Sequence, residues 1–247
     1  MSFSMKIPYF PSAIRCLLLS GVLLGGLQAG AQVLAVQPVN IFLHAGEQAT
    51  TLGVSNLGAT DTAVQVRAYV WSMKDGVESL TPTHDLLVSP PIATIAPHAT
   101  QIIRLVQHGS PAKTEVTYRI LVDQIPPAAA PGTVRIVVRL SIPVFAEPMV
   151  QANPHDTFRL ENSGGKLTLV GVNDGNRHDT LHDIELKGSG GILLKPVASS
   201  SPYLLAGSTQ HWTLAGHPLP DATKQLSLTA VGINGAIREQ VPVVSAP

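Results

Sequence analysis

Residues 132–145, GTVRIVVRLSIPVF, have the alternating pattern of a β-strand. As a strand, this ribbon places on one face Val134, Ile136, Val138, Leu140, Ile142 and Val144, and on the other Thr133, Arg135, Val137, Arg139, Ser141 and Pro143. Pro143 has no N–H to donate, so we expect that part of the ribbon at a sheet edge or a bulge. Soluble proteins usually shorten, charge or cover a long apolar edge, because it templates pairing with other chains. The ribbon therefore either binds another chain or packs in the core of its own protein.

The rest of the chain contains further segments of period two and almost nothing with helical periodicity. The candidate strands are residues 33–43, 49–56, 63–71, 101–107, 117–125, 166–173, 183–187, 225–233 and 237–244. Turn signals lie between them at Asn56-Leu-Gly58, Asp75-Gly76, Asp174-Gly175 and Asn234-Gly235, and the last two suit tight hairpin turns. Short strands at this spacing predict an all-β protein made of antiparallel sandwiches. No internal repeat is evident, so the two halves share only their β character.

The N-terminal residues 1–31 have the features of a secretory signal peptide. Lys6 and Arg15 precede the apolar run CLLLSGVLLGGL, which ends at AGA, and this predicts cleavage after Ala31. The run is too short and too rich in glycine for a membrane anchor, and no later segment approaches twenty apolar residues. The only cysteine, Cys16, precedes the hydrophobic run. The mature chain is therefore expected to have no disulfide and no thiol chemistry.

The length and charge of the mature chain narrow the classes of protein. About 216 residues suit two domains of about 100 each, and we predict them at 32–147 and 148–247, with the boundary in AEPMVQANPHD, residues 146–156. Removing residues 1–31 leaves 14 basic against 16 acidic residues, a net charge of −2. A nucleic-acid partner would require a basic patch, so this balance argues against one.

Catalytic motifs are sparse. There is no G-x-S-x-G nucleophile elbow. His178 and His182, with Asp179 and Asp183 beside them, contain the residue types that bind zinc. No third histidine follows at a recognisable spacing, so we favour a solvated turn leading into residues 183–187. Trp71 and Trp212 are expected to be packing residues, since aromatic residues form only 4% of the chain.

The order of these segments resembles the periplasmic chaperones of chaperone–usher pilus assembly. The resemblance covers essentially everything after Ala31, and its segments are VQPVNIFLHAGEQATTLGVSNLG (36–58), VQVRAYVW (64–71), LLVSPPIATIAPHATQIIRLV (86–106), YRILVDQIPP (118–127), VRIVVRLSIPVF (134–145), LTLVGVNDGNRHDTLHDIEL (167–186) and YLLAGSTQHWTL (203–214). VQVRAYVW, YRILVDQIPP and SIPVF are closer to the archaic or alternative branch, related to spore-coat-protein-U-like pilins, than to the chaperones of P or type 1 pili.

The resemblance implies a fold and a role for the ribbon. It implies two immunoglobulin-like β-sandwich domains in tandem. Pilus subunits of this pathway lack their final strand, and the chaperone fills the open groove with the last strand of its first domain, by β-augmentation. The residues that would enter the groove are Val134, Ile136, Val138 and Leu140. The alternative, in which the ribbon only packs its own core, stays open.

The resemblance also implies an anchor for the C-terminal carboxylate of the subunit. In the better-known branch, an Arg on the first strand and a Lys on the last strand hold this carboxylate. Here Asn40 or Ile41 stands at the first position and Ser141 at the second. The candidate replacements are Arg139, Arg119 and Arg135, because a guanidinium binds a carboxylate with bidentate geometry. Each could instead be a solvated charge that discourages aggregation.

The resulting hypothesis is a periplasmic chaperone that is not an enzyme, requires no cofactor or nucleotide and binds no nucleic acid. It would bind pilus subunits, deliver them to an outer-membrane usher and, without a client, cap itself or dimerise. Two alternatives remain. One is a secreted structural or adhesive β-sandwich, although the chain lacks the cysteine pair of a pilin. The other is a secreted metal-dependent hydrolase that uses His178, His182 and a carboxylate.

Overall fold

The computed structural model describes residues 34–109, 112–126, 136–197, 201–216, 219–220 and 222–245. Ala31–Pro247 form one compact unit. The regular elements of the described residues are β-strands, apart from the short 3-10 turn Ser189–Gly191, and the all-β prediction is confirmed. The predicted signal peptide, Cys16, Val134 and Arg135 lie outside the described residues. Within those residues, no helix is long and apolar enough to span a membrane.

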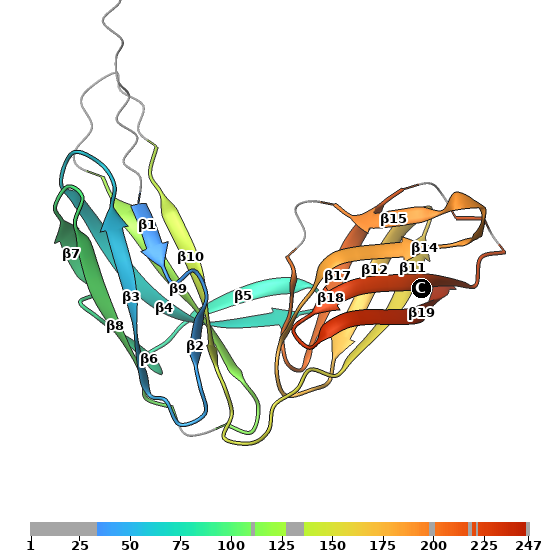
Figure 1. Cartoon of the computed structure of the whole chain (residues 1–247), viewed down its shortest axis with the longest axis horizontal. Coiled ribbons are helices and arrows are strands. Elements are labelled where there is room, and N and C mark those ends of the chain that lie inside the picture. The colour runs from blue at the N-terminus through green and yellow to red at the C-terminus, as the bar shows by residue number, and fades with distance from the viewer. Residues whose placement is uncertain are drawn as a thin grey trace, which may run out of the picture. The chain divides into compact units, whose positions relative to one another are not determined.

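The N-terminal half contains two sheets (Figure 1). The first has the order β1 (Leu34–Gln37), β3 (Ala49–Asn56), β8 (Thr100–Gln107) and β6 (Leu86–Ser89). The second has the order β2 (Ile41–Leu43), β10 (Arg139–Ala146), β9 (Val116–Ile125), β4 (Thr62–Lys74) and β5 (Val77–Pro82), with β7 (Ile92–Ile95) also paired to β4. Alternate residues of both sheets meet in one core, which includes Leu52, Val64, Ile103, Leu105, Ile120 and Val144. The alternation in the sequence thus becomes one buried and one outer face on each strand.

The prediction of a single strand at residues 33–43 is wrong, because this segment forms two strands that belong to different sheets. Its first part, β1, pairs antiparallel with β3, and its second part, β2, pairs parallel with β10. Pro38 lies between them and has no N–H for a ladder. The chain therefore contributes to both sheets of the sandwich within ten residues.

The C-terminal half is a ring of hydrogen-bonded strands around a second core. In order, the ring contains β11 (Asp156–Ser163), β12 (Lys166–Asn173), β17 (Ser208–Ala215), β15 (Leu193–Pro196), β14 (His182–Lys187), β18 (Gln225–Gly232) and β19 (Gly235–Ser245), and β19 closes it by pairing parallel with β11. The short strands β13 (Asp179–Thr180) and β16 (Tyr203–Leu204) pair with each other. The core includes Leu169, Leu186, Leu228 and Trp212, so the packing role predicted for Trp212 is confirmed.

The connection between the two cores carries no strand. β10 ends at Ala146 and β11 begins at Asp156, and the predicted boundary at residues 146–156 falls in this connection. The limits of the two domains stay a prediction.

Two of the predicted turns join neighbouring strands. Asp75 and Gly76 both have positive φ, 51° and 75°, and form the two-residue loop between β4 and β5. The β18–β19 loop comprises Ile233 and Asn234, one residue earlier than predicted, and Gly235 follows with a φ of 111°.

The hairpin predicted at Asp174-Gly175 is wrong, because this turn leads from β12 to β13, which do not pair. The backbone N–H of Gly175 instead donates to Oδ1 of Asn173 at 2.9 Å. A Cβ at Gly175 would lie 2.5 Å from the carbonyl oxygen of Asn153, so this close approach of two backbone segments requires glycine.

Candidate functional site

Strand β10 has an open edge over most of its length. It pairs antiparallel with β9 from Arg139 to Ala146, whereas on its other side β2 pairs only with Val144–Ala146. Within the described part of the chain, the outer side of residues 139–143 has no strand partner. Pro143, which cannot donate to a ladder, lies in this open part, as its chemistry predicts.

The ribbon changes character along its length. Ile142 and Val144 are buried in the N-terminal core, and Leu140 packs partly against it. Residues 136–138 precede β10 and form no strand, so the prediction of a strand through this part of the ribbon is wrong. Here Ile136 is 89% exposed and Val137 is 53% exposed. The core-packing alternative therefore holds for the second part of the ribbon and not for residues 136–137. Of the predicted groove-filling residues, Ile136 is free, Val138 is half-buried and Leu140 is engaged in the protein's own core.

Polar contacts mark the point where the ribbon joins the sheet. Nε of Arg139 donates to Oδ1 of Asp123, whose Oδ2 accepts from Arg67 at 2.6 Å. The N–H of Gln124 donates to the carbonyl oxygen of Val138 at 3.0 Å. Burial favours a higher pKa for Asp123, but the hydrogen bonds from Arg139 and then Arg67 outweigh it and hold the pKa below its usual value. Arg139 is thus a paired side chain in the free protein.

Of the two predicted anchor residues that the structure describes, Arg119 and Arg139, Arg119 is the more buried. It lies on β9, opposite Pro143 of β10, and its side chain is only 12% exposed. Its guanidinium carbon lies 3.7 Å from the ring centroid of Trp71 and 5.3 Å from that of Tyr203. Burial lowers the pKa of Arg119, and the charge of Glu78 opposes this shift. The carboxylate of Glu78 stands 3.8 Å away, beyond hydrogen-bond distance.

An aromatic cluster supports Arg119. Trp71, Met73, Phe145 and Leu205 are buried together, with Tyr203 packed against them. Tyr203 meets the Trp71 ring edge-on at 5.1 Å, and its hydroxyl donates to Oδ1 of Asn40 at 3.4 Å. The packing role predicted for Trp71 is confirmed. Asn40, which stands where the better-known chaperones have an Arg, therefore lies on the same aromatic cluster as Arg119.

The expectation of a solvated turn at His178 is wrong. His178 is 2% exposed, and its ring stacks on Phe145 with 3.7 Å between centroids. Its Nδ1 lies 2.7 Å from Oε1 of Glu115, and its backbone N–H donates to the same oxygen at 3.1 Å. Asp179 is buried as well. The described residues contain no cluster of three or more potential metal ligands, so the two histidines of the zinc hypothesis form no such group here.

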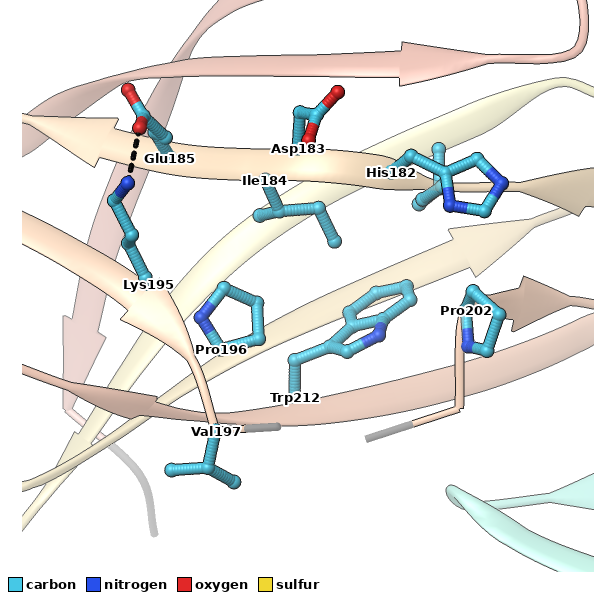
Figure 2. Close-up of a pocket in the computed structure, with 10 residues that line it drawn as sticks. His182, Asp183, Ile184, Glu185, Lys195, Pro196, Val197, Pro202 and Trp212 are labelled. Carbon is cyan, nitrogen blue, oxygen red and sulfur yellow. Dashed lines mark ion pairs between the residues drawn. The ribbon is translucent and has the colours of Figure 1, made fainter. Parts of the chain in front are cut away.

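A pocket of about 350 Å³ lies in the C-terminal half, between β14 and the strands β15 and β17 (Figure 2). His182 and Asp183 line it, and Glu185 lies between Lys187 and Lys195 at 2.8 and 2.6 Å. Hydrogen bonds from these two lysines lower the pKa of Glu185 to about 2. Among the described residues that line the pocket, none is a serine, threonine or cysteine.

A buried carboxyl pair, which the sequence analysis missed, lies elsewhere in the C-terminal half. Burial, together with a hydrogen bond to Asp179, raises the pKa of Asp156 to about 8. Asp179 itself accepts the backbone N–H groups of Thr180 and Ile233, each at 2.7 Å. Nothing in the sequence indicates this pairing, because the two carboxyls are brought together by strands 23 residues apart.

These features define a class: an all-β protein of two cores in tandem, in which the described part of the first has an open strand edge preceded by exposed apolar residues. Residues 33–152 match the family described as pili and flagellar-assembly chaperone, PapD N-terminal domain. This match to the N-terminal domain of a pilus chaperone agrees with the resemblance that the order of the segments predicts. The family is one of assembly chaperones, which agrees with the expectation that the chain is not an enzyme.

Solved structures share the fold over both halves of the chain. One is a chain of the CsuC–CsuE chaperone–tip adhesion subunit complex from archaic Csu pili of Acinetobacter baumannii, with a TM-score of 0.63 and 21% identity, covering 87% of this chain and 100% of that chain. The YadV chaperone has a TM-score of 0.60 and 18% identity, and the match covers 85% of this chain and 98% of that chain. The chaperone DraB of E. coli has a TM-score of 0.52 and 19% identity, and the match covers 87% of this chain and 97% of that chain. The prediction of two immunoglobulin-like sandwiches in tandem is confirmed. No curated protein sequence matches.

Proposed function

We propose that this protein is a periplasmic chaperone that binds pilus subunits by adding its ribbon to their incomplete fold. The observation that carries the proposal is the exposure of Ile136 and Val137 shortly before the open edge of β10, which begins at Arg139. Full burial of an isoleucine side chain contributes about 2 kcal/mol, and the free N–H and C=O groups of β10 supply main-chain hydrogen bonds. The edge therefore offers the two contributions that β-augmentation requires.

The donor segment in this proposal is Val134, Ile136 and Val138, with Leu140 as its last member. Leu140 already contacts the N-terminal core, so it would join the chaperone's own packing to the subunit's. The buried residues Ile142 and Val144 hold the strand in its sheet. The same ribbon is thereby anchored at one end and available at the other.

Arg119 is the anchor that we favour for the subunit's C-terminal carboxylate. Its guanidinium has no carboxylate within hydrogen-bond distance among the described residues, whereas Arg139 is engaged by Asp123. An ion pair in a partly desolvated site is stronger than one in water. An incoming carboxylate would also offset the burial that lowers the pKa of Arg119. Arg135 remains a candidate from the sequence alone.

Cleavage after Ala31, export to the periplasm, delivery to an outer-membrane usher and self-capping without a client belong to the same proposal. The family match supports a periplasmic chaperone. The CsuC–CsuE complex comes from archaic pili, which supports assignment to that branch. The open edge of β10 supports self-capping, because an unpaired strand edge templates pairing with another chain.

The proposal is tested by affinity capture of the tagged protein from the periplasm of its native host, followed by mass spectrometry. We expect small secreted β-rich subunits at about one to one with the unaltered protein and their loss with Ile136→Asp. Ile102→Asp is the matched control, since Ile102 is also an exposed isoleucine, at 54%, but lies on β8 in the other sheet. Retention of the subunits by Ile136→Asp, or equal loss with Ile102→Asp, contradicts strand donation.

The choice of anchor is tested in the same capture experiment with Arg119→Gln and Arg139→Gln. We expect the larger loss of subunits with Arg119→Gln, because it removes the charge without a hydrogen-bonded carboxylate. Urea unfolding of both variants controls for the stacking of Arg119 on Trp71. A larger loss with Arg139→Gln, at equal stability, would transfer the anchor to Arg139.

A further inference from the structure

We propose that Asp123 and Gln124 form a clamp that fixes the register of the donor ribbon where it leaves the sheet. The inference rests on the proposed function and assigns a positioning role to two residues at the end of β9. Both contact the ribbon at consecutive residues, Asp123 at Arg139 and Gln124 at Val138. The clamp therefore stands between the buried part of the ribbon and the exposed Ile136.

The Asp123 side of the clamp spans three adjacent strands. Asp123 on β9 accepts from Arg67 on β4 through one oxygen and from Arg139 on β10 through the other. The Asp123 side chain is only 16% exposed, whereas the Arg139 side chain is 61% exposed, so the carboxylate is held inside the sheet surface and Arg139 reaches it from the solvent side through a charge-assisted hydrogen bond. The three residues tie the ribbon to the interior of the sheet and not to its neighbour alone.

The Gln124 side of the clamp replaces part of the strand ladder. The backbone N–H of Gln124 donates to the carbonyl oxygen of Val138, as expected between antiparallel strands. The N–H of Val138 donates in return to the side-chain Oε1 of Gln124, at 3.3 Å. Gln124 is buried, so its amide is held in place. One residue thus satisfies both main-chain groups of Val138, the last ribbon residue before the exposed segment.

Register matters here because a strand has a period of two. A slip of one residue would exchange Ile136 for its neighbour Val137 on the face that meets the subunit, and would move every following side chain to the opposite face. Buried Ile142 resists such a slip in the second part of the ribbon. At Val138 the side chain is only half-buried, so the polar contacts of Asp123 and Gln124 specify the register at that point.

The first test measures backbone hydrogen exchange in the free protein, without any client. In Gln124→Leu we expect the amide of Val138 to exchange about tenfold faster, because its acceptor is lost. Asp123→Asn should have the same effect, because it weakens the bonds to both arginines. The amides of β8 should be unchanged, which separates a local role from general destabilisation. Glu185→Gln is the matched control, because Glu185 is also a carboxylate held by two cations and lies in the other half.

The second test applies the same variants to the capture of subunits from the periplasm of the native host. We expect both clamp variants to retain a reduced fraction of the subunits, Ile136→Asp to retain none and Glu185→Gln to retain all. Unchanged exchange at Val138, or full retention by both clamp variants while Ile136→Asp retains none, overturns the clamp alone. Retention by Ile136→Asp overturns the proposed function itself. If Gln124→Leu does not fold, Gln124→Asn replaces it, since its shorter side chain cannot reach Val138.

Discussion

The two halves of the molecule contain the same buried asparagine and differ in their strand edges. Asn56 ends β3 and donates through Nδ2 to the carbonyl oxygens of Thr60 and Ile95, while its Oδ1 accepts from Gly58. Asn173 ends β12 and bonds in the same way to the carbonyl oxygens of Arg177 and Leu204 and to the N–H of Gly175. The expectation that the halves share only their β character is therefore wrong.

The difference lies in how each half treats its edges. In the C-terminal half, β11, β12, β17, β15, β14, β18 and β19 close into a ring, whereas β10 in the N-terminal half keeps an open side over residues 139–143. Closure removes the unpaired N–H and C=O groups that template association. Among the described residues, one half thus closes its strands into a ring and the other leaves an edge open, and the difference is made by a few strand pairings.

Truncating the ribbon at two places should sharpen this comparison most. Ile142→Ala removes a side chain buried in the N-terminal core and should lower the free energy of unfolding by about 3 kcal/mol. Ile136→Ala removes an exposed side chain and should change it by no more than about 0.5 kcal/mol. Urea unfolding measures both. Equal losses would show that the ribbon is a core strand throughout its length.

The shared asparagine can be tested by substitution in both halves. Asn56→Ala and Asn173→Ala should each cost about 2 kcal/mol, because each leaves buried carbonyl and N–H groups without partners. Urea unfolding again gives the measurement, with Asn40→Ala as the exposed control. If only one of the two substitutions destabilises the protein, the two hydrogen-bond patterns are not equivalent in energy.

The pH dependence of stability should have opposite signs in the two halves. The pKa of Asp156 in the folded protein is about 8, against 3.8 for an ordinary aspartate. Its contribution to the free energy of unfolding is therefore fully present below about pH 4 and is lost as the pH rises to 8. The pKa of Asp123 in the folded protein is lowered. Its contribution to the free energy of unfolding is therefore present above pH 3.8 and is lost as the pH falls through the lowered pKa.

Urea unfolding between pH 4 and 8 measures the part of this dependence that is due to Asp156, with Asp156→Asn as the comparison, and urea unfolding below pH 4 measures the part that is due to Asp123. The variant keeps the shape of the side chain and cannot ionise, so the decline in stability with rising pH should become shallower. A decline as steep as that of the unaltered protein would mean that another group binds the proton.

Strand positions were predictable because the alternation of buried and outer residues is local. Residues 49–56 and 166–173 form β3 and β12 with the predicted bounds. β5 was missed because all six of its residues are exposed, so it has no alternation to detect. His178 was misjudged because its burial depends on Glu115, 63 residues earlier, and on stacking against Phe145.

The sequence by itself determined the class of fold, the family and the apolar ribbon with Pro143 at its edge, because each follows from residues close together along the chain. Only the tertiary structure decided where the ribbon stops being core and becomes free surface, since burial of Ile142 and exposure of Ile136 depend on which strands lie beside them. It also decided which carboxylate each arginine meets, because Asp123 accepts a hydrogen bond from Arg139, whereas Arg119 faces Glu78 at 3.8 Å. Charge in a sequence shows what could bind, and only the folded chain shows which charges are already bound to each other.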